Sequence, residues 1–365
     1  MLFLPVILLA GVNAVQWHTL TEPRHHVDAV EASFNEDSRA AFLGWAAHHK
    51  KHYETAEERE RRFQVWLSNR DYARDHNSRK RSYQLGMTSF ADQTREEHQR
   101  HKGWVNQADR RQRLGTGLVN TTLSVPHSVD WREMGAVTPA KNQASCGSCW
   151  TFSVTGAVEG INAIRTGKLV SLSEQQLVDC DGHDAGCNGG LMDFGFDYIL
   201  KNSGIDTEND YPYRAEQGYC NARKEGRHVV TIDGYEDVPH NNEQALMRAV
   251  ARQPVSIAIS AGDRDFQLYV GGIFDGPCST ELNHGVLLVG YGSEHGKDFW
   301  IVKNSWGTAW GVDNGYIRLA RNIADPRGQC GVAMQPSYPV KKSSNPEPDF
   351  SGLLSSYLYT SHLAF

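Results

Sequence analysis

The clearest helical pattern of hydrophobic positions lies near the N-terminal end of the chain. Between residues 54 and 77, Phe63, Trp66 and Ala73 fall near one face of a helix, and charged residues fill most other positions. This spacing predicts an amphipathic helix. A break around Gly86 follows, and the polar, arginine-rich stretch that starts at residue 107 is typical of an exposed, cleavable linker.

Two kinds of pattern divide the rest of the chain. From Cys149 apolar residues recur at helical spacing up to Gly167, which can end a helix, and Ser173 with Gln176 predicts a capping box for a second helix. Helical signals dominate to about residue 233. After about residue 239 and one more helix, apolar runs between glycines predict strands, over 255–260, 284–292, 298–304 and 315–320. A helical half beside a β half predicts an α+β fold with a site in the cleft between them.

The two ends of the chain have compositions of their own. The stretch "MLFLPVILLAGVNA" has the length of a signal-peptide core and is too short to span a bilayer, so we expect residues 1–14 to be a signal peptide. A buried N-terminal strand is the alternative. Secretion would imply an oxidising compartment, in which cysteines pair. From residue 341 the sequence "KKSSNPEPD" predicts a linker into a C-terminal extension, residues 341–365, which is too short and too polar to cross a membrane.

Charge separates a leader from a body. Residues 15–124 hold 18 Lys and Arg against 15 Asp and Glu, nine of the 16 histidines and no cysteine. Residues 125–365 hold 19 Lys and Arg against 28 Asp and Glu, and all seven cysteines. The overall net charge of −6 gives no support for nucleic-acid binding.

Cysteine chemistry centres on "QASCGSCWTFS". A zinc half-site at Cys146 and Cys149 would need a second thiolate pair, and the chain has no other C-x-x-C. A redox pair would need a flanking βαβ pattern, which the sequence does not offer. We favour a third interpretation, in which one cysteine forms a structural bridge and Cys149, at a helix start that favours the thiolate, is a nucleophile.

A nucleophilic thiolate needs a histidine close by in space and a group that holds the histidine ring. His284 stands at the entry of a predicted strand, and Asn304 precedes a Trp–Gly run. Taken singly, such residues are more often structural. Together with Cys149 they form a candidate Cys/His/Asn constellation.

Four motifs in this order resemble the papain-like cysteine peptidases. They are "VDWREMGAVTPAKNQASCGSCWTFS", "GCNGGLMD", "LNHGVLLVGYG" and "VKNSWGTAWG". The resemblance covers about residues 40–340. It implies a two-subdomain α+β fold, with a helical half at about 134–235, a β half at about 236–337 and the active-site cleft between them. A helical inhibitory propeptide, 15–124, would precede the peptidase, 125–340.

The resemblance also implies residue roles. Cys149 would be the nucleophile and His284 its acid–base partner, with Asn304 orienting His284. Gln143 and the Cys149 backbone N–H would face the oxyanion. The cleft would be lined by Gly189, Gly190, Leu191, Met192, Ala258, Leu282, Asn283, Trp306 and Gln335. Gly189 and Gly190 would leave an open edge for an extended peptide, Trp306 would shield the His284–Asn304 hydrogen bond, and Gln335 would lie at the far end of an otherwise apolar pocket.

Disulfide pairing follows from the same resemblance. It implies bridges Cys146–Cys187, Cys180–Cys220 and Cys278–Cys330, with Cys149 outside them. No cofactor and no metal are implied. Asn120 opens an N-glycosylation sequon, "NTT".

The leader resembles the family's propeptide in two motifs. One is the interspersed helix motif Glu58, Arg62, Trp66, Asn69, Ala73 and Asn77; the other is Gly86, Thr88, Phe90 and Asp92. Ala73 and Thr88 depart from the usual Ile and Asn, so we expect weaker packing at Ala73 without loss of the inhibitory fold.

The expected function is a cysteine endopeptidase made as a zymogen in the secretory pathway, for a lysosome- or vacuole-like compartment or the exterior. Its partners would be peptide substrates, with an apolar residue preferred two before the cut, and its own propeptide; the mature enzyme would be a monomer. A non-enzymatic relative would lack a site residue, and none of Cys149, His284 and Gln143 is missing. An exopeptidase would need an extra loop or a retained peptide that blocks one end of the cleft, and no histidine-rich insertion stands between Cys187 and Cys220.

Acid is the expected trigger of maturation. Histidines cluster in the leader, and near pH ~5 they would charge together. We expect the leader to unfold before the disulfide-linked body and to expose the linker over 110–123, so that cleavage frees a chain that begins near Val125. The alternative is that these histidines are merely solvated.

Overall fold

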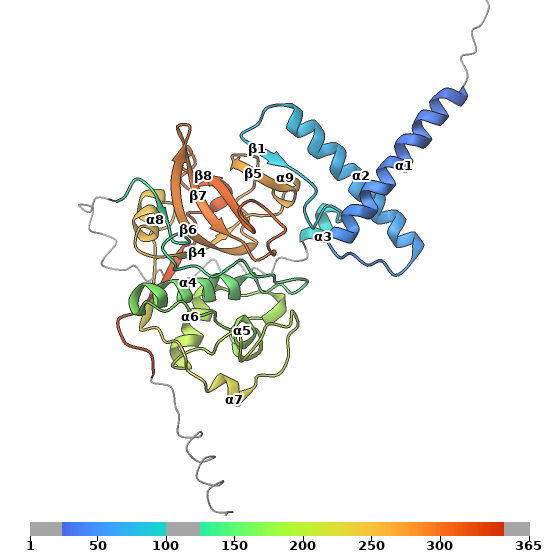
Figure 1. The fold of residues 1–365 in the computed structure, drawn as a ribbon. Coiled ribbons are helices and arrows are strands. Elements are labelled where there is room, and N and C mark those ends of the chain that lie inside the picture. Colours follow the sequence, from blue (N-terminus) through green and yellow to red (C-terminus); the bar gives the residue numbers. More distant parts are fainter. Residues whose placement is uncertain (1–23, 100–124, 347–365) are drawn as a thin grey trace, which may run out of the picture.

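The computed structural model describes residues 24–99 and 125–346. Three expected features lie outside this part of the chain: the signal peptide at 1–14, the linker with Asn120, and the extension beyond residue 346. Figure 1 shows the helical half beneath the β half, with the leader beside the β half. No helix in the described part is long and apolar enough to cross a membrane.

Two long helices that cross each other form the leader, α1 (Arg24–His48) and α2 (Ala56–Ser78). Helix α2 matches the helix expected over 54–77 to within two residues, and the Thr55 side chain caps it by accepting a hydrogen bond from the Glu58 N–H. Phe42 of α1 packs edge-on against Phe63 and Trp66 of α2. Ala73 is buried, so the small side chain stands inside the leader's packed face.

The leader also contributes a strand, β1 (Tyr83–Leu85), which the sequence pattern did not predict. This strand pairs antiparallel with β5 (Tyr269–Phe274) of the body. Three residues are too few for alternation to be visible, so the otherwise helical leader carries one strand that has no signal in the sequence. Beyond it lies the short helix α3 (Arg95–Gln99).

Helices α4–α7 make the helical half: α4 (Cys149–Thr166), α5 (Glu174–Cys180), α6 (Met192–Lys201) and α7 (Ala222–Glu225), with a 3₁₀ turn, η1 (Gly186–Asn188). Helix α4 ends at Gly167, as predicted, because Gly167 takes the left-handed conformation with φ +73°. The predicted capping box is only half formed. The Ser173 side chain accepts from the Gln176 N–H, but the Gln176 side chain turns away to the Asp206 N–H and Tyr198.

A nine-stranded sheet forms the β half and runs in the order β1-β5-β8-β7-β6-β4-β9-β3, with β2 paired to β6. Its other strands are β2 (Val129–Asp130), β3 (Gly234–Asp237), β4 (Val255–Ile259), β6 (His284–Glu294), β7 (Lys297–Lys303), β8 (Tyr316–Ala320) and β9 (Ser337–Val340). Helices α8 (Glu243–Val250) and α9 (Arg264–Gln267) and the turn η2 (Gln329–Gly331) complete it. The four predicted strands correspond to β4, β6, β7 and β8. Helix α4 packs along β6, so the longest helix described in the body and its longest strand meet where the halves join.

The start of the expected C-terminal linker is a packed part of the body. Lys341 is only 1% exposed, and its ammonium donates to the Thr231 carbonyl and to Asn345 Oδ1, at 2.8 Å each. Asn345 in turn donates to Asn162 on α4. The expectation of a linker from residue 341 was therefore wrong at Lys341 and Asn345, while residues 342–344 are exposed, because a charged side chain found buried partners that its sequence neighbourhood does not reveal.

Candidate active site

Helix α4 places Cys149 as its first residue, at the junction of the two halves. The backbone N–H of Gly285, the second residue of β6, donates to Cys149 Sγ at 3.3 Å. Cys149 is fully buried, and its neighbour Cys146 is tied to Cys187 by a disulfide. The sulfur thus lies at a helix N-terminus, where partial positive charge favours an anion.

His284 and Asn304 come together because β6 and β7 are paired. His284 is the first residue of β6, and Asn304 follows the last residue of β7. His284 Nε2 and Asn304 Oδ1 are 2.8 Å apart, which makes Nε2 the donor, and Oδ1 also accepts the Ser305 N–H at 2.8 Å. The Trp306 ring stacks on the His284 ring with 4.8 Å between centroids. Both residues are buried, so the hydrogen bond is kept from water.

Gln143 is held from both halves of the molecule. Its backbone N–H donates to the Ser305 carbonyl, its Oε1 accepts from Ser305 Oγ at 2.6 Å, and its Nε2 donates to the Cys146 carbonyl at 2.9 Å. One amide hydrogen is thereby used, and the orientation of the group is fixed. Ser305 was not singled out from the sequence, although it stands inside the quoted Asn-Ser-Trp run.

The expected peptide edge has a packing reason for its glycines. A Cβ on Gly190 would lie 2.6 Å from the Trp150 ring. Gly189 has φ +122°, a backbone conformation that residues other than glycine rarely adopt. Both constraints arise from the fold, and they are compatible with a role toward substrate.

Two residues that were expected to line the substrate pocket, Ala258 and Met192, come from distant segments and lie near Gly285. Ala258 on β4 is paired with Gly285, and Met192 Sδ lies 3.2 Å from where a Gly285 Cβ would stand. Leu191 is also buried, and Leu282 Cδ2 lies 2.8 Å from where a Gly331 Cβ would stand. Asn283 uses its side-chain oxygen to accept the Ala261 N–H at 2.9 Å. Gln335 is half-buried, two residues before Ser337, which pairs with Ser256 of β4.

Three disulfides stabilise the loops that surround these residues. They join Cys146 to Cys187, Cys180 to Cys220 and Cys278 to Cys330, the same pairs that the resemblance implied. Cys149 is the cysteine outside them.

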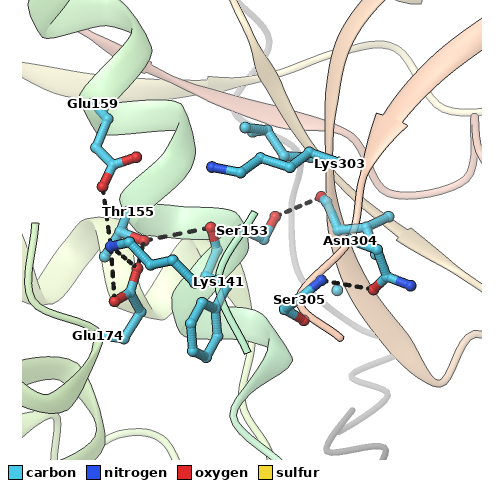
Figure 2. Close-up of a pocket in the computed structure, with 12 residues that line it drawn as sticks. Lys141, Ser153, Thr155, Glu159, Glu174, Lys303, Asn304 and Ser305 are labelled. Atoms are coloured by element: carbon cyan, nitrogen blue, oxygen red, sulfur yellow. Dashed lines mark hydrogen bonds and ion pairs between the residues drawn. The ribbon is translucent and has the colours of Figure 1, made fainter. Parts of the chain in front are cut away.

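A cluster of four buried charges lies behind the site, between α4 and the end of β7, and was not foreseen (Figure 2). The Lys141 ammonium contacts Glu174 at 2.7 Å and Glu159 at 3.3 Å, and Lys303 donates to Thr138. Burial raises the pKa of Glu174 to about 7, with Lys141 opposing and Glu159 adding to the shift. Burial also opposes ionisation of Glu159, but Lys141 and Lys303 hold its pKa below the usual range. Burial lowers the pKa of Lys303, which stands next to Asn304.

The leader packs over Trp306 of the candidate active site. Phe90 and His98 both contact the Trp306 ring, with centroids 5.3 and 4.8 Å away. Further along, Thr88 donates to the Gln267 carbonyl, and Tyr72 and Tyr83 both donate to the Asp265 carboxylate. These contacts place leader side chains directly over the indole that covers His284.

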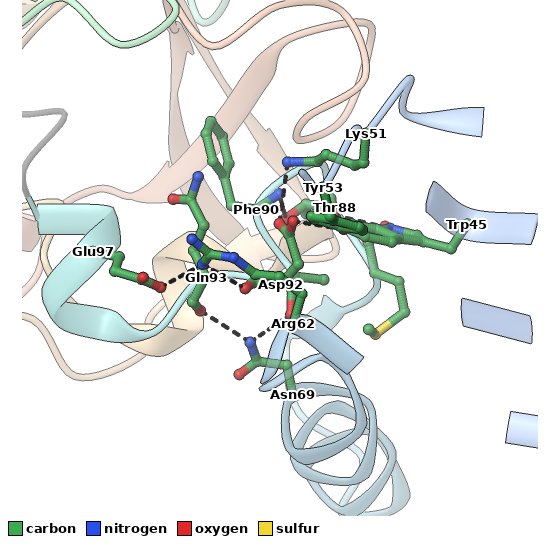
Figure 3. A network of polar contacts seen from close by, with 12 residues as sticks. Trp45, Lys51, Tyr53, Arg62, Asn69, Thr88, Phe90, Asp92, Gln93 and Glu97 are labelled. Atoms are coloured by element: carbon green, nitrogen blue, oxygen red, sulfur yellow. Dashed lines mark hydrogen bonds and ion pairs between the residues drawn. The ribbon is translucent and has the colours of Figure 1, made fainter. Parts of the chain in front are cut away.

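Side chains of the two expected leader motifs form one network (Figure 3). Arg62 bridges Glu97 at 2.7 Å and the Asp92 carbonyl, while the Asp92 carboxylate contacts Tyr53 and Lys51. Asn69 donates to the Ala91 carbonyl, and Glu58 lies 3.5 Å from Arg62. Two further members lie near β1, where Asn77 exchanges two hydrogen bonds with the Leu85 backbone and the Gly86 N–H donates to the Leu268 carbonyl.

Comparison with known proteins identifies the family. Residues 125–340 match the papain family cysteine proteases, and residues 42–98 match the cathepsin propeptide inhibitor domain (I29). The chain belongs to the papain family of cysteine proteases. Its leader is the propeptide of a proenzyme, and the family fold agrees with the α+β architecture expected from the sequence.

Relatives and solved structures agree with this assignment. The probable cysteine protease RD21B of Arabidopsis thaliana is 50% identical over 360 residues, 94% of this chain and 76% of that protein. The KDEL-tailed cysteine endopeptidase CEP2 of the same plant is 50% identical over 88% of this chain and 91% of its own length. The proform of the ragweed pollen protease Amb a 11 superposes with a TM-score of 0.77 at 40% identity, over 85% of this chain and 96% of that one.

Proposed function

We propose that this papain-family protease is an endopeptidase that works through a thioester on Cys149. The observation that supports this most is the junction of α4, β6 and β7, where the Cys149 sulfur, the His284–Asn304 pair and the Gln143 amide meet. His284 Nε2 donates to Asn304, so the other ring nitrogen, Nδ1, is the one that can exchange a proton with the thiol.

The proposed reaction has two halves. The Cys149 thiolate attacks the carbonyl carbon of the peptide, a C–S bond forms, and the oxyanion accepts from Gln143 Nε2 and the Cys149 N–H. The His284 imidazolium gives its proton to the departing amine as the C–N bond breaks. His284 then takes a proton from water, the hydroxide attacks the thioester, and the carboxylic acid leaves as the C–S bond breaks and the thiolate returns.

Substrate preference follows from the pocket of Leu191, Met192, Ala258 and Leu282. These apolar side chains favour an apolar residue two before the cut. Gln335 would let polar side chains enter as well, and an extended peptide would lie along Gly189 and Gly190. Preference for basic residues at this position in a peptide-library digest would contradict the assignment.

The precursor would mature in stages. Residues 1–14 would direct it to the secretory pathway, Asn120 would carry a glycan, and residues 15–124 would occupy the cleft until removed. The mature unit would comprise residues 125–340 and act as a monomer. Its destination would be a lysosome- or vacuole-like compartment or the exterior, and the extension that follows residue 340 has no role that we assign.

The test replaces the nucleophile. Cys149→Ala should give a folded precursor with all three disulfides and essentially no hydrolysis of a blocked peptide amide. Gln143→Ala should retain more activity, with a loss of about 10²–10³-fold, because it removes one oxyanion donor and leaves the covalent route open. Activity of Cys149→Ala above a tenth of wild type would refute the mechanism.

A further inference from the structure

Tyr213 reaches the oxyanion side of the site from a loop that the mechanism does not otherwise use. Its hydroxyl donates to the backbone carbonyl of Gln143 at 2.9 Å and lies 2.6 Å from Ser148 Oγ. Because the tyrosine proton goes to Gln143, the serine hydroxyl is the donor to Tyr213. The Tyr213 hydroxyl oxygen thus links Gln143, which carries the side-chain oxyanion donor, to Ser148, which precedes Cys149.

The peptide that Tyr213 contacts is part of a strained turn. Ala144, directly after Gln143, has φ +52°, a left-handed conformation that is strained for a residue with a Cβ. The Ala144 N–H donates to Asn142 Oδ1 at 2.9 Å, and Tyr213 holds the carbonyl on the other side of the same peptide. Such a conformation persists only where its surroundings determine it from several sides.

The Tyr213 ring and hydroxyl have separable tasks. The ring packs edge-on against Phe152, three residues into α4 from Cys149, with centroids 4.9 Å apart. Its own backbone N–H is held by Glu208 at 2.9 Å. Burial raises the pKa of Tyr213 above its usual value, so the hydroxyl keeps its proton and stays a donor at any pH at which the enzyme works. A phenylalanine would keep the ring contact and lose only the hydrogen bonds.

We propose that Tyr213 is a positioning residue for catalysis, which sets the Gln143 amide relative to the Cys149 N–H through the Gln143 carbonyl and Ser148. The inference rests on the proposed function, since it presumes that these two groups receive the oxyanion. The hydroxyl is hydrogen-bonded to Gln143 and Ser148 and acts through them. Its effect is therefore confined to the steps in which negative charge develops on the carbonyl oxygen.

Tyr213→Phe is compared with a matched control from the same loop, Tyr211→Phe. The Tyr211 hydroxyl donates to Asp179 at 2.9 Å and contacts none of Gln143, Ser148 and Cys149 in the described part of the chain. Both variants are made as full chains, matured at acid pH and titrated for active sites. Tyr213→Phe should lower kcat about tenfold with KM nearly unchanged, because it displaces an oxyanion donor that it does not remove. Tyr211→Phe should leave kcat within about twofold.

Two further measurements separate positioning from general damage. The inhibition constant of a peptide aldehyde, whose adduct carries the oxyanion, should rise by the same factor as kcat/KM falls. The rate of alkylation of Cys149 by iodoacetamide, which forms no oxyanion, should stay constant. Equal losses in alkylation and hydrolysis, or equal effects of the two tyrosine variants, would overturn the proposal.

Gln143→Ala tests the proposed oxyanion site separately from the role of Tyr213. If Gln143→Ala retains full kcat, the oxyanion assignment itself fails, whatever Tyr213→Phe does. If Gln143→Ala loses activity and Tyr213→Phe does not, the proposed function stands and the role of Tyr213 is refuted. If Tyr213→Phe fails to fold, Ser148→Ala, which removes the second link of the same chain, should show a smaller loss of kcat with the same constant alkylation rate, and an unchanged kcat would refute the proposal.

Discussion

At the residue scale, Asn304 decides which nitrogen of His284 faces the thiol. Its Oδ1 can only accept, so it fixes the proton on Nε2 and leaves Nδ1 for exchange. Trp306 and the leader residue Phe90 that packs on it shield this hydrogen bond from water. A bond away from solvent is stronger than one in water, and its loss leaves a buried donor unsatisfied.

Replacement of Asn304 by alanine should lower kcat about 10²-fold, the lower end of what positioned acid–base catalysis contributes, because the imidazole stays but loses its orientation. Steady-state kinetics of the matured enzyme measures this. Asn202→Ala is the control, since the Asn202 side chain also makes two hydrogen bonds, which it donates to the Gly204 and Glu225 carbonyls, and Asn202 directly follows α6. Similar losses in the two variants would mean that Asn304 acts through stability alone.

At the scale of elements, the leader histidines differ in their surroundings. His49, at the end of α1, packs on Trp45, and burial together with the charges of His48 and Lys51 lowers its pKa. His48 and His52 are exposed, and His98 is buried against Phe90 and Trp306. The histidines that cluster in sequence therefore differ in burial, and burial lowers the pKa of His49.

The lowered pKa of His49 determines how the stability of the folded leader changes with pH. The unfolded leader takes up a proton near the ordinary pKa of about 6.5 and the folded one at lower pH, so the free energy of unfolding falls as pH drops through this range. His49→Gln should shift maturation to lower pH, and the exposed control His52→Gln should leave it unchanged. The measurement is the pH at which half of the precursor has lost its leader after a fixed time. Identical midpoints for wild type and His49→Gln would point to other groups, such as Asp92.

At the scale of the whole molecule, buried charge joins the two halves. Lys141 and Glu159 belong to the helical half, while Lys303 ends β7 (Figure 2). Ion pairs in such a place cost desolvation energy as well as gaining attraction, so they give weak stabilisation but strong dependence on each partner. The cluster therefore makes the joint between the halves sensitive to pH.

The raised pKa of Glu174 determines whether the free energy of unfolding rises or falls with pH. Its pKa of about 7 in the folded protein lies above the unfolded value, so the folded state holds a proton that the unfolded state releases. The free energy of unfolding should fall as pH rises from about 4.5 to 7, by up to about 3 kcal/mol. Glu174→Gln should flatten this dependence. Denaturant unfolding of the body in the Cys149→Ala background measures it, with exposed Glu216→Gln as control, and an unflattened curve would contradict the prediction.

The sequence by itself determined the local features. Apolar spacing and the glycine at its end set helix α4, because these signals act within one or two turns. Alternation between glycines predicted β4, β6, β7 and β8 for the same reason. The motifs around Cys149, His284 and Asn304, read through their resemblance to a family, brought the candidate site residues together before any geometry was known.

Tertiary structure alone decided what depends on distant segments meeting. The pairing of β1 with β5 joins residues almost 190 positions apart. The Lys341 ammonium donates to the Thr231 carbonyl, and the Tyr213 hydroxyl donates to the Gln143 carbonyl. The pKa of Glu174 likewise depends on how deeply the closed halves bury it. None of these contacts has a periodic signature, because a buried charge or a long-range hydrogen bond is specified by the neighbours that folding supplies and not by the residues beside it in the chain.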